Sequence, residues 1–286
     1  MTFLLEHDVD QLELGLRGRY MALQEVLGSF DAVVVGLSGG VDSTLLAVMA
    51  KKVLGGTRVL CATAISASLG LDDRSYCGEF AERYELAYRE VYTEEFDDER
   101  YLVNDSMRCY YCKSSLMDKL VPLAEELDAT VVLGVNMDDL RDIRPGQRAA
   151  SEAGARFPFV DARISKDDIR ELARWLGVET WDRPQAACLS SRIPFGTPVT
   201  LGNVSAVDRA ERSLRRLGFR QVRVRHHGEI ARVEVELSEL PRVFELRETV
   251  VDKVRQAGFQ FVAIDLEGFR SGSMHRRVSM QPEGKE

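Results

Sequence analysis

The sequence predicts an α/β protein with a doubly wound parallel sheet and a second, smaller α+β domain. Three observations support this fold class. Apolar runs typical of buried strands alternate with amphipathic helical stretches over residues 1–180, a glycine-rich turn joins the first strand to the next helix, and the pattern changes after residue 200. The 286 residues are enough for two domains with sizeable cores.

Residues 1–180 alternate between helical and extended patterns. The expected elements are helix 11–27, strand 32–37, helix 44–53, strand 58–65, helix 72–86, strand 88–92, helix 110–127, strand 130–135 and helix 169–176. Ser165 and Asp168 form a capping pattern before the last of these helices, and Gly177 ends it. This βαβα alternation predicts a parallel sheet whose ligands bind at the carboxyl ends of its strands.

A segment with weak periodicity follows the first domain. Residues 179–198 contain three of the eight prolines together with a cysteine and several serines, so we expect residues 181–200 to form an ordered functional loop. Residues 201–286 would then form the α+β domain. Its expected elements are a helix from residue 204, strands 221–226 and 230–235, helix 240–257 and strand 259–264. His227-Gly228 suits a tight hairpin between the first two of those strands.

The hexapeptide Ser38-Gly39-Gly40-Val41-Asp42-Ser43 lies between a predicted strand and a predicted helix. Backbone N–H groups and the positive end of the helix dipole make such a junction an anion site. The two glycines let phosphate approach the backbone, and the two serine hydroxyls add donors. Asp42 would repel phosphate unless a cation lay between them, so it predicts Mg²⁺. The spacing fits neither a Walker loop nor a dinucleotide fingerprint, and an ordinary helix cap is the simpler alternative.

A second polar patch follows the strand predicted at residues 130–135. Gly134 and Asp138 would reach the same edge of the sheet as the phosphate loop. Asp138 or Asp139 is a candidate to share Mg²⁺ with Asp42. Three arginines further along offer planar donors for anions or, alternatively, form surface ion pairs: Arg144, Arg148 and Arg156.

Five cysteines in a chain whose N-terminus lacks signal-peptide character indicate catalytic or metal-binding thiols rather than disulfides. Cys109 and Cys112 form a C-x-x-C pair, and Cys188 lies far downstream. The pair fits half a zinc site, a redox dithiol or part of a cluster ligand set. Three thiolates without an obvious fourth ligand suit a cubane cluster with one open iron. Cys61 and Cys77 fall within a predicted strand and helix, and we expect both to be buried structural residues.

The composition is that of an ordinary soluble globular protein, and the cytoplasm is the expected compartment. No apolar stretch reaches the roughly 18 residues of a membrane span. The net charge of −8 argues against binding long nucleic-acid tracks. Residues 208–232 nevertheless contain eight arginines against three acidic residues, which predicts either an anionic partner or a solvated helix face.

Taken together, the motifs resemble the LarE-type ATP-dependent sulfur transferases, which belong to the pyrophosphate-loop ATP pyrophosphatases. The similar segments are Ser38–Ser43, Arg144–Gly146 with Ser151–Arg156, Ser190–Thr197, Val222–His226 and Gly268–Gly272. They extend from about residue 30 to residue 274, and the later ones are more specific than the phosphate loop. The resemblance implies an adenine nucleotide alpha hydrolase-like fold for the first domain.

The resemblance also implies a reaction. Members of the family adenylate the carboxylates of a pyridinium-3,5-biscarboxylic acid mononucleotide and replace AMP with sulfur, which gives thiocarboxylates for the nickel-pincer nucleotide cofactor. One branch takes the sulfur from a single sacrificial cysteine. This chain departs from that branch because Cys109 and Cys112 accompany Cys188. The trio resembles the branch in which three cysteines hold a [4Fe-4S] cluster that carries a transferable sulfide.

The residues and the resemblance together assign roles. The expected ATP-binding residues are Ser38, Gly39, Gly40, Asp42, Ser43, Gly134 and Asp138. Asp42 and Cys188 are the expected catalytic residues, and Cys188 would share the cluster with Cys109 and Cys112. Arg192, Arg223 and Arg225 are the expected substrate-binding residues, the last two on one face of a strand. The expected cofactors are ATP, Mg²⁺ and the cluster.

The expected partners are a small nucleotide substrate, a sulfide or persulfide donor, and further copies of the chain, because relatives form homo-oligomers. Three other functions fit parts of the pattern. A tRNA thiolase would use the same ATP and cluster chemistry, and the arginine-rich segment favours it while the acidic total opposes it. An ATP pyrophosphatase of the NAD synthetase kind would not need three cysteines. A nucleotide-binding redox sensor would hold ATP and a cluster without turnover.

Overall fold

The computed structural model describes residues 8–141, 145–184 and 187–270. The chain divides into two compact units, of which unit 1 comprises Met1–Tyr101 with Asp105–Ala186 and unit 2 comprises Leu102–Asn104 with Ala187–Glu286. The short segment before Asp105 belongs to unit 2 because the buried side chain of Asn104 is bonded there. Its amide donates to the carbonyl oxygens of Pro194 at 2.8 Å and Thr197 at 2.7 Å.

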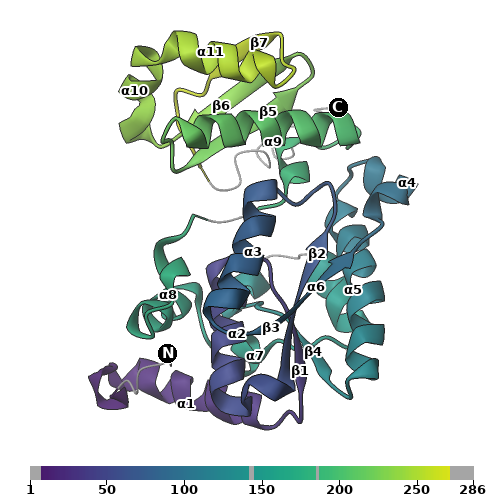
Figure 1. Ribbon diagram of the computed structural model, residues 1–286, viewed down its shortest axis with the longest axis vertical. Helices are drawn as coiled ribbons and strands as arrows, with labels where there is room; N and C mark the ends of the chain where they lie inside the picture. The colour runs from purple at the N-terminus through teal and green to yellow at the C-terminus, as the bar shows by residue number, and fades with distance from the viewer. Residues whose placement is uncertain (1–7, 142–144, 185–186, 271–286) are drawn as a thin grey trace, which may run out of the picture. The chain divides into compact units, whose positions relative to one another are not determined.

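Unit 1 contains a four-stranded parallel sheet in the order β3-β2-β1-β4. The strands are β1 (Val33–Gly36), β2 (Val59–Ile65), β3 (Ala87–Tyr92) and β4 (Thr130–Val132). Because β1 lies in the interior and the chain extends the sheet on both sides of it, the sheet is doubly wound (Figure 1). This confirms the predicted α/β class, although β4 is shorter than the expected strand.

Helices cover both faces of this sheet. They are α1 (Leu14–Gly28), α2 (Val41–Leu54), α3 (Leu71–Arg83), α5 (Arg108–Glu126), α6 (Pro145–Glu152), α7 (Pro158–Asp161) and α8 (Lys166–Trp175), and α4 (Glu99–Leu102) precedes α5 in the chain. Successive side chains of a strand point to opposite faces. Val33 and Val35 therefore enter a core with α1, α2 and α8, whereas Val34 enters a second core with α5.

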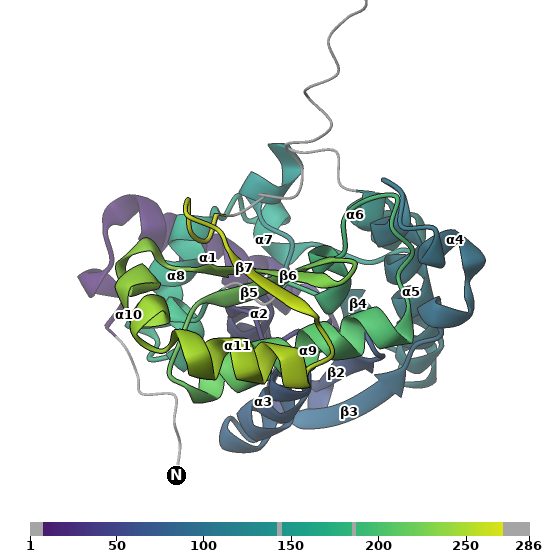
Figure 2. The same cartoon turned by 90° about the horizontal axis from the view of Figure 1, so that it is seen from above.

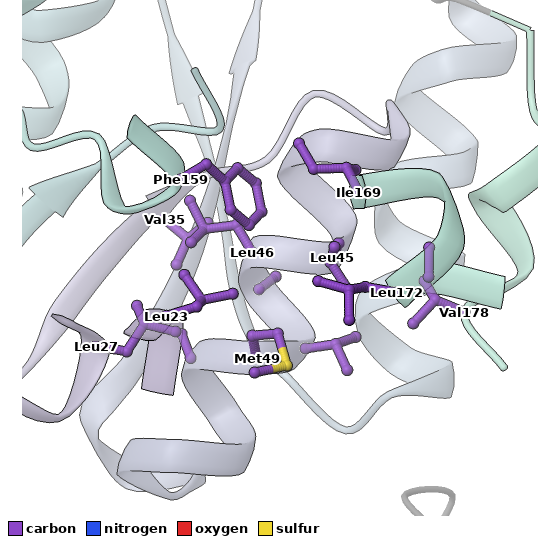
Figure 3. Packing of buried hydrophobic residues seen from close by; sticks show 14 of the residues in the cluster. Leu23, Leu27, Val35, Leu45, Leu46, Met49, Phe159, Ile169, Leu172 and Val178 are labelled. Carbon is purple, nitrogen blue, oxygen red and sulfur yellow. The ribbon is translucent and has the colours of Figure 1, made fainter. Parts of the chain in front are cut away.

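The larger of these cores supports the helix that follows the phosphate loop. Figure 3 shows Leu45, Leu46 and Met49 of α2 packed among apolar side chains from α1, β1, α7 and α8. All three are fully buried. Burial of each such side chain contributes about 1.5–3 kcal/mol relative to its exposure to water. The N-terminus of α2 is therefore fixed on unit 1 by its packing.

Unit 2 contains a mixed sheet in the order β5-β6-β7, with β5 antiparallel and β7 parallel to β6. Its elements are α9 (Leu201–Arg216), β5 (Val222–His227), β6 (Ile230–Val235), α10 (Leu240–Glu245), α11 (Arg247–Gln256) and β7 (Phe261–Ile264). The expected hairpin is present, with Gly228 at φ 66°.

One expected element of unit 2 was wrong. The single helix predicted over residues 240–257 is two helices, because Leu246 between them has φ −95° and ψ 13°. The predicted α+β character of this part is confirmed. Within the described ranges, no helix is both long and apolar enough to cross a membrane.

Candidate functional site

The predicted phosphate loop lies between β1 and the N-terminus of α2, as expected. Gly39 has φ 74°, a conformation that favours glycine, and a Cβ there would make a tight contact of 3.1 Å with the Sγ of Cys77. Gly40 is the N-cap of α2, and no described side chain caps the helix. The first N–H groups of α2 are therefore left to a ligand. The hydroxyls of Ser38 and Ser43 lie 3.1 Å apart beside them.

Asp42 lies in a network of polar groups at the same edge of the sheet. Its Oδ1 accepts a hydrogen bond from the amide of Asn136 at 3.1 Å, and its Oδ2 accepts one from Nζ of Lys166 at 2.5 Å. The backbone N–H of Lys166 donates to Oδ2 of Asp138 at 2.8 Å. The structure thus brings together Asp42 and Asp138, the two acidic residues predicted to serve ATP and its metal.

Asn136 and Lys166 are the residues that sequence reasoning missed here. Asn136 had a local signal, because it follows a buried strand in the same loop as Asp138. Lys166 had none, since it is the first residue of α8 and reaches Asp42 only through the packing of α8 on α2. Carboxylate oxygens suit Mg²⁺, so Asp42 fits the predicted metal, while Lys166 balances its charge.

Gly134 is the third part of this site. A Cβ on Gly134 would lie 2.9 Å from the carbonyl carbon of Asp42 and 3.0 Å from the backbone nitrogen of Ser43. Both contacts are with backbone atoms at the start of α2, which cannot move as a side chain can. The residue after β4 is therefore small because the phosphate loop packs directly against it.

Gly134→Ala should weaken ATP binding and lower the free energy of unfolding by about 1–3 kcal/mol, the usual cost of overpacking. The matched control is Gly18→Ala in α1, where a Cβ meets nothing within 4 Å. That control should leave ATP affinity unchanged and raise stability slightly, because alanine favours a helix over glycine. Calorimetric titration with ATP and chemical denaturation would measure both variants. Unchanged ATP affinity in Gly134→Ala would contradict the predicted role.

The five cysteines divide into two classes. Cys61 and Cys77 are fully buried, and burial raises the pKa of Cys61 to about 12 and that of Cys77 to about 11, so both remain thiols. Cys109 and Cys188 are exposed and Cys112 is half-buried. The three predicted cluster ligands are thus the three accessible thiols, and a thiol must be accessible to exchange sulfur.

Cys109 and Cys112 lie near the start of α5, and their spacing places them on one helix face. Gly146 of the Arg144–Gly146 motif packs against this turn, since a Cβ there would lie 2.9 Å from the carbonyl oxygen of Cys109. Cys188 belongs to unit 2. Within the described ranges, no group of three or more metal-ligating side chains is gathered. The three-cysteine cluster therefore stays a prediction.

The loop that bears Cys188 is held by a buried ion pair. Arg192 is 2% exposed, and its Nε and Nη2 donate to the two carboxylate oxygens of Glu211 at 2.8 and 3.0 Å. Its Nη1 donates to the carbonyl oxygens of Ala187 at 2.6 Å and Cys188 at 3.0 Å. The guanidinium therefore fixes the backbone of Cys188 to helix α9.

Glu211 collects further donors although it is fully buried. It accepts hydrogen bonds from Arg215 at 2.7 Å and from the backbone N–H of Val224 at 3.0 Å. Burial alone would raise the pKa of this carboxyl, but the positive charge of Arg192 and its hydrogen bonds hold the pKa below its usual value. Glu211 is thus ionised and links the Cys188 loop, α9 and β5.

The two arginines predicted on β5 are present on one face of that strand. Arg225 donates twice to Oε2 of Glu234, at 2.9 and 3.1 Å, and once to the carbonyl oxygen of Ser191 at 3.2 Å. The guanidinium of Arg223 lies over the ring of Phe269, 5.4 Å from its centroid. Burial, and next the charge of Arg192, lower the pKa of Arg223 to about 10, so it remains a cation at neutral pH.

The predicted substrate arginines therefore lie close to carboxylates that sequence reasoning did not single out, Glu211 and Glu234. The remaining arginine candidates differ. Arg148 pairs with Glu152 at 2.8 Å and Arg156 pairs with Asp161 at 3.2 Å, both as exposed surface ion pairs. Arg144 and the end of the Gly268–Gly272 motif lie outside the described residues.

The chain is similar to several known proteins. A family model for NAD synthase matches residues 20–98, which contain the phosphate loop. An uncharacterised protein of Synechocystis is 41% identical over 265 residues, which cover 91% of this chain and 98% of that protein. An uncharacterised protein of Methanocaldococcus jannaschii is 29% identical over 240 residues, which cover 84% of this chain and 91% of that protein.

The pyridinium-3,5-bisthiocarboxylic acid mononucleotide synthase of Lactiplantibacillus plantarum is 35% identical to this chain over 254 residues. The aligned part covers 88% of this chain and 92% of that protein, so both units take part in the similarity. The phosphate loop and the β5 motif occur here on the elements predicted for them. The chain therefore belongs to the LarE family, which includes that synthase.

Proposed function

We propose that the protein is an ATP-dependent sulfur transferase that converts a pyridinium-3,5-biscarboxylic acid mononucleotide into its thiocarboxylate form. The observation that carries this proposal is the 35% identity to a synthase of that product along nearly the whole of both chains. The phosphate loop supports the use of ATP, because its uncapped helix start, two glycines and two hydroxyls suit a polyphosphate.

The first step would be adenylation. A substrate carboxylate oxygen attacks the α-phosphorus of ATP, the bond to the β-phosphate oxygen breaks, and pyrophosphate leaves. The N–H groups at the start of α2 and the hydroxyls of Ser38 and Ser43 would stabilise the departing charge. Mg²⁺, held by Asp42, would supply Lewis-acid stabilisation of the same oxygens when bound. Lys166 would then be free to move from Asp42 to a phosphate oxygen.

The second step would be sulfur transfer. Adenylation makes the carboxylate oxygen a good leaving group, so a sulfur nucleophile can attack the acyl carbon and release AMP. Cys109, Cys112 and Cys188 are the accessible thiols, and three thiolates are the ligand set of a [4Fe-4S] cluster with an open iron. Such a cluster would supply a transferable sulfide when bound. The Arg192–Glu211 pair would keep Cys188 in place for this step.

Arg223 and Arg225 are proposed to hold the phosphate of the substrate. Arg223→Ala should raise the KM for the mononucleotide at least about tenfold, the usual cost of losing hydrogen bonds to a charged group, with a smaller change in kcat. The control is Arg247→Ala, which removes the same charge at the exposed start of α11 and should leave the KM unchanged. Steady-state kinetics after a check of thermal stability would measure both. An unchanged KM in the Arg223 variant would refute this role.

The proposed function is tested by incubating anaerobically reconstituted protein with ATP, Mg²⁺, sulfide and the biscarboxylate mononucleotide. We expect pyrophosphate and AMP to be released only with the mononucleotide present, and mass spectrometry to show replacement of oxygen by sulfur in its carboxylates. Pyrophosphate release that depends on tRNA, together with sulfur in the recovered tRNA, would instead establish tRNA thiolation. Absence of pyrophosphate with either acceptor would leave nucleotide binding without turnover and would refute the proposal.

A further inference from the structure

Unit 2 contains a cationic pocket that the proposed reaction does not use. The cavity has a volume of about 240 Å³, and its lining residues are Arg209, Arg212, Ser213, Arg216, Lys253, Gln256 and Ala257. Four of the seven carry a positive charge and none is acidic. The lining residues belong to α9 and to the C-terminal part of α11 with its cap Ala257. Figure 2 shows these two helices along one side of the small sheet. The pocket shares no lining residue with the phosphate loop or with the arginines of β5.

Helix α9 presents two different charged faces. Glu211 and Arg215 lie one turn apart on the face that contacts Arg192. Arg209, Arg212 and Arg216 repeat at three and four residues and therefore form a separate stripe, which faces α11. The arginine-rich pattern of the sequence is thus split, and only one part of it is used by the Glu211 network.

Carboxylates of the described residues balance the charges of the pocket only in part. Within the described ranges, Arg216 forms no ion pair, and Lys253 bonds only the side-chain oxygen of Gln256, at 3.4 Å. Arg212 approaches Asp208 on its own helix, at 3.8 Å. Arg209 donates to the backbone carbonyl of Ala257 at 2.8 Å, which holds this guanidinium in the wall of the pocket. Like charges gathered in this way favour a bound anion.

A simpler explanation covers only part of this arrangement. Cations in the last turn of a helix interact favourably with its dipole, and Arg216 and Lys253 occupy such positions in α9 and α11. Arg209 and Arg212 lie further from the end of α9, so the helix dipole does not account for them. Nor does it account for the convergence of side chains from both helices on one cavity.

We propose that this pocket binds a compact phosphate-type oxyanion, either inorganic pyrophosphate or the phosphate end of a nucleotide. Guanidinium groups match the oxygen pairs of phosphate, and the hydroxyl of Ser213 supplies a neutral donor for a further oxygen. The amide of Gln256 donates to the carboxylate of Asp252 at 2.7 Å. The only apolar lining residue is Ala257, so an acidic peptide would find no anchor for its side chains. The cavity is smaller than the roughly 300–1,000 Å³ typical of sites that enclose a whole drug-sized ligand, which favours a phosphate group.

The test compares two double variants that remove the same charge. Arg216→Gln with Lys253→Gln alters the pocket, whereas Arg170→Gln with Arg247→Gln alters exposed arginines elsewhere. Each pair is made in a chain that also carries Ser38→Ala and Ser43→Ala, which weakens binding at the phosphate loop. Calorimetric titration without Mg²⁺ then uses inorganic pyrophosphate, and a second titration uses AMP.

We expect the parent chain and the control to bind pyrophosphate with affinities within about twofold of each other. The pocket variant should bind at least about tenfold more weakly, because hydrogen bonds to a charged group are lost. Binding of AMP with the same dependence on the pocket would identify the nucleotide as a ligand, and binding of pyrophosphate alone would identify the free anion. Equal affinities in the pocket variant and the control, or no binding by the parent chain, would overturn the proposal. The titrations measure binding and not enzymatic activity, so failure of the proposed reaction would not affect this result.

Discussion

Cys188→Ala should abolish thiocarboxylate formation while pyrophosphate release from ATP continues. The phosphate loop, Asp42 and Gly134 all belong to unit 1, and none of their described contacts involves Cys188. Removal of the thiol therefore leaves adenylation intact and removes only the sulfur step. We expect sulfur transfer to fall by roughly 10³-fold or more, as is usual when a catalytic nucleophile is lost. Mass spectrometry of the product and a pyrophosphate assay on the same sample measure the two steps.

The other cysteines separate the two possible sulfur sources. If a cluster supplies the sulfide, Cys109→Ala and Cys112→Ala should lose bound iron and sulfur transfer together with Cys188→Ala. If Cys188 is itself the donor, only the Cys188 variant should fail, and the wild-type protein should complete one round. Cys61→Ala is the control, because this buried thiol has a pKa of about 12 and no access to substrate. Repeated turnover by Cys188→Ala would contradict both mechanisms.

The phosphate site was predictable from the sequence because its determinants are local. A buried strand, a glycine pair and the start of a helix are contiguous in the chain, and the carboxyl end of a neighbouring parallel strand must lie beside them. The sequence alone could therefore place Gly134 and Asp138 at the edge of the sheet that holds the phosphate loop. The burial of Cys61 and Cys77 was also predicted, because they fall within a predicted strand and a predicted helix of the first domain.

The partners of the charged residues were not predictable, because they depend on packing between distant segments. Lys166 reaches Asp42 across 124 positions of sequence. Arg192 is predicted to bind substrate, and the structure shows its guanidinium bonded to Glu211 and to the backbone of Cys188. No spacing rule connects Arg192 in a loop with Glu211 in the middle of a helix. Sequence patterns predicted the arginines, whereas their acidic partners could be identified only from the tertiary structure.

Breaking the Arg192–Glu211 pair should have the largest effect on stability. Removal of one partner takes the principal counter-charge away from a buried group, which costs about 3–5 kcal/mol. We therefore expect Arg192→Met and Glu211→Gln each to lower the free energy of unfolding in that range. The double variant should lose less than the sum of the two, because each single change already breaks the same interaction. Additive losses in chemical denaturation would show that the two side chains act independently.

The dependence on pH follows from the lowered pKa of Glu211. In the unfolded chain this carboxyl has a pKa near ~4.3. A carboxyl with a lower pKa in the folded state stabilises the protein above the unfolded value, and that contribution disappears as the pH falls through the folded pKa. The difference in stability between the wild type and Glu211→Gln should therefore be largest above about pH 4.3 and shrink in more acidic solution. A difference that grows on acidification would contradict an ionised Glu211.

The same pair should control the reactivity of Cys188, which separates a positioning role from general loss of structure. Arg192 binds the carbonyl oxygen of Cys188 directly, whereas Cys109 lies in the other unit. Under conditions in which Arg192→Met remains folded, alkylation of Cys188 should change in rate while alkylation of Cys109 stays at the wild-type rate. Arg215→Met is the matched control, since Arg215 also bonds Glu211 but lies on α9 rather than on the Cys188 loop. Equal changes at both cysteines would mean that the pair supports the fold alone, whereas a change confined to Cys188 would mean that it holds the thiol for sulfur transfer.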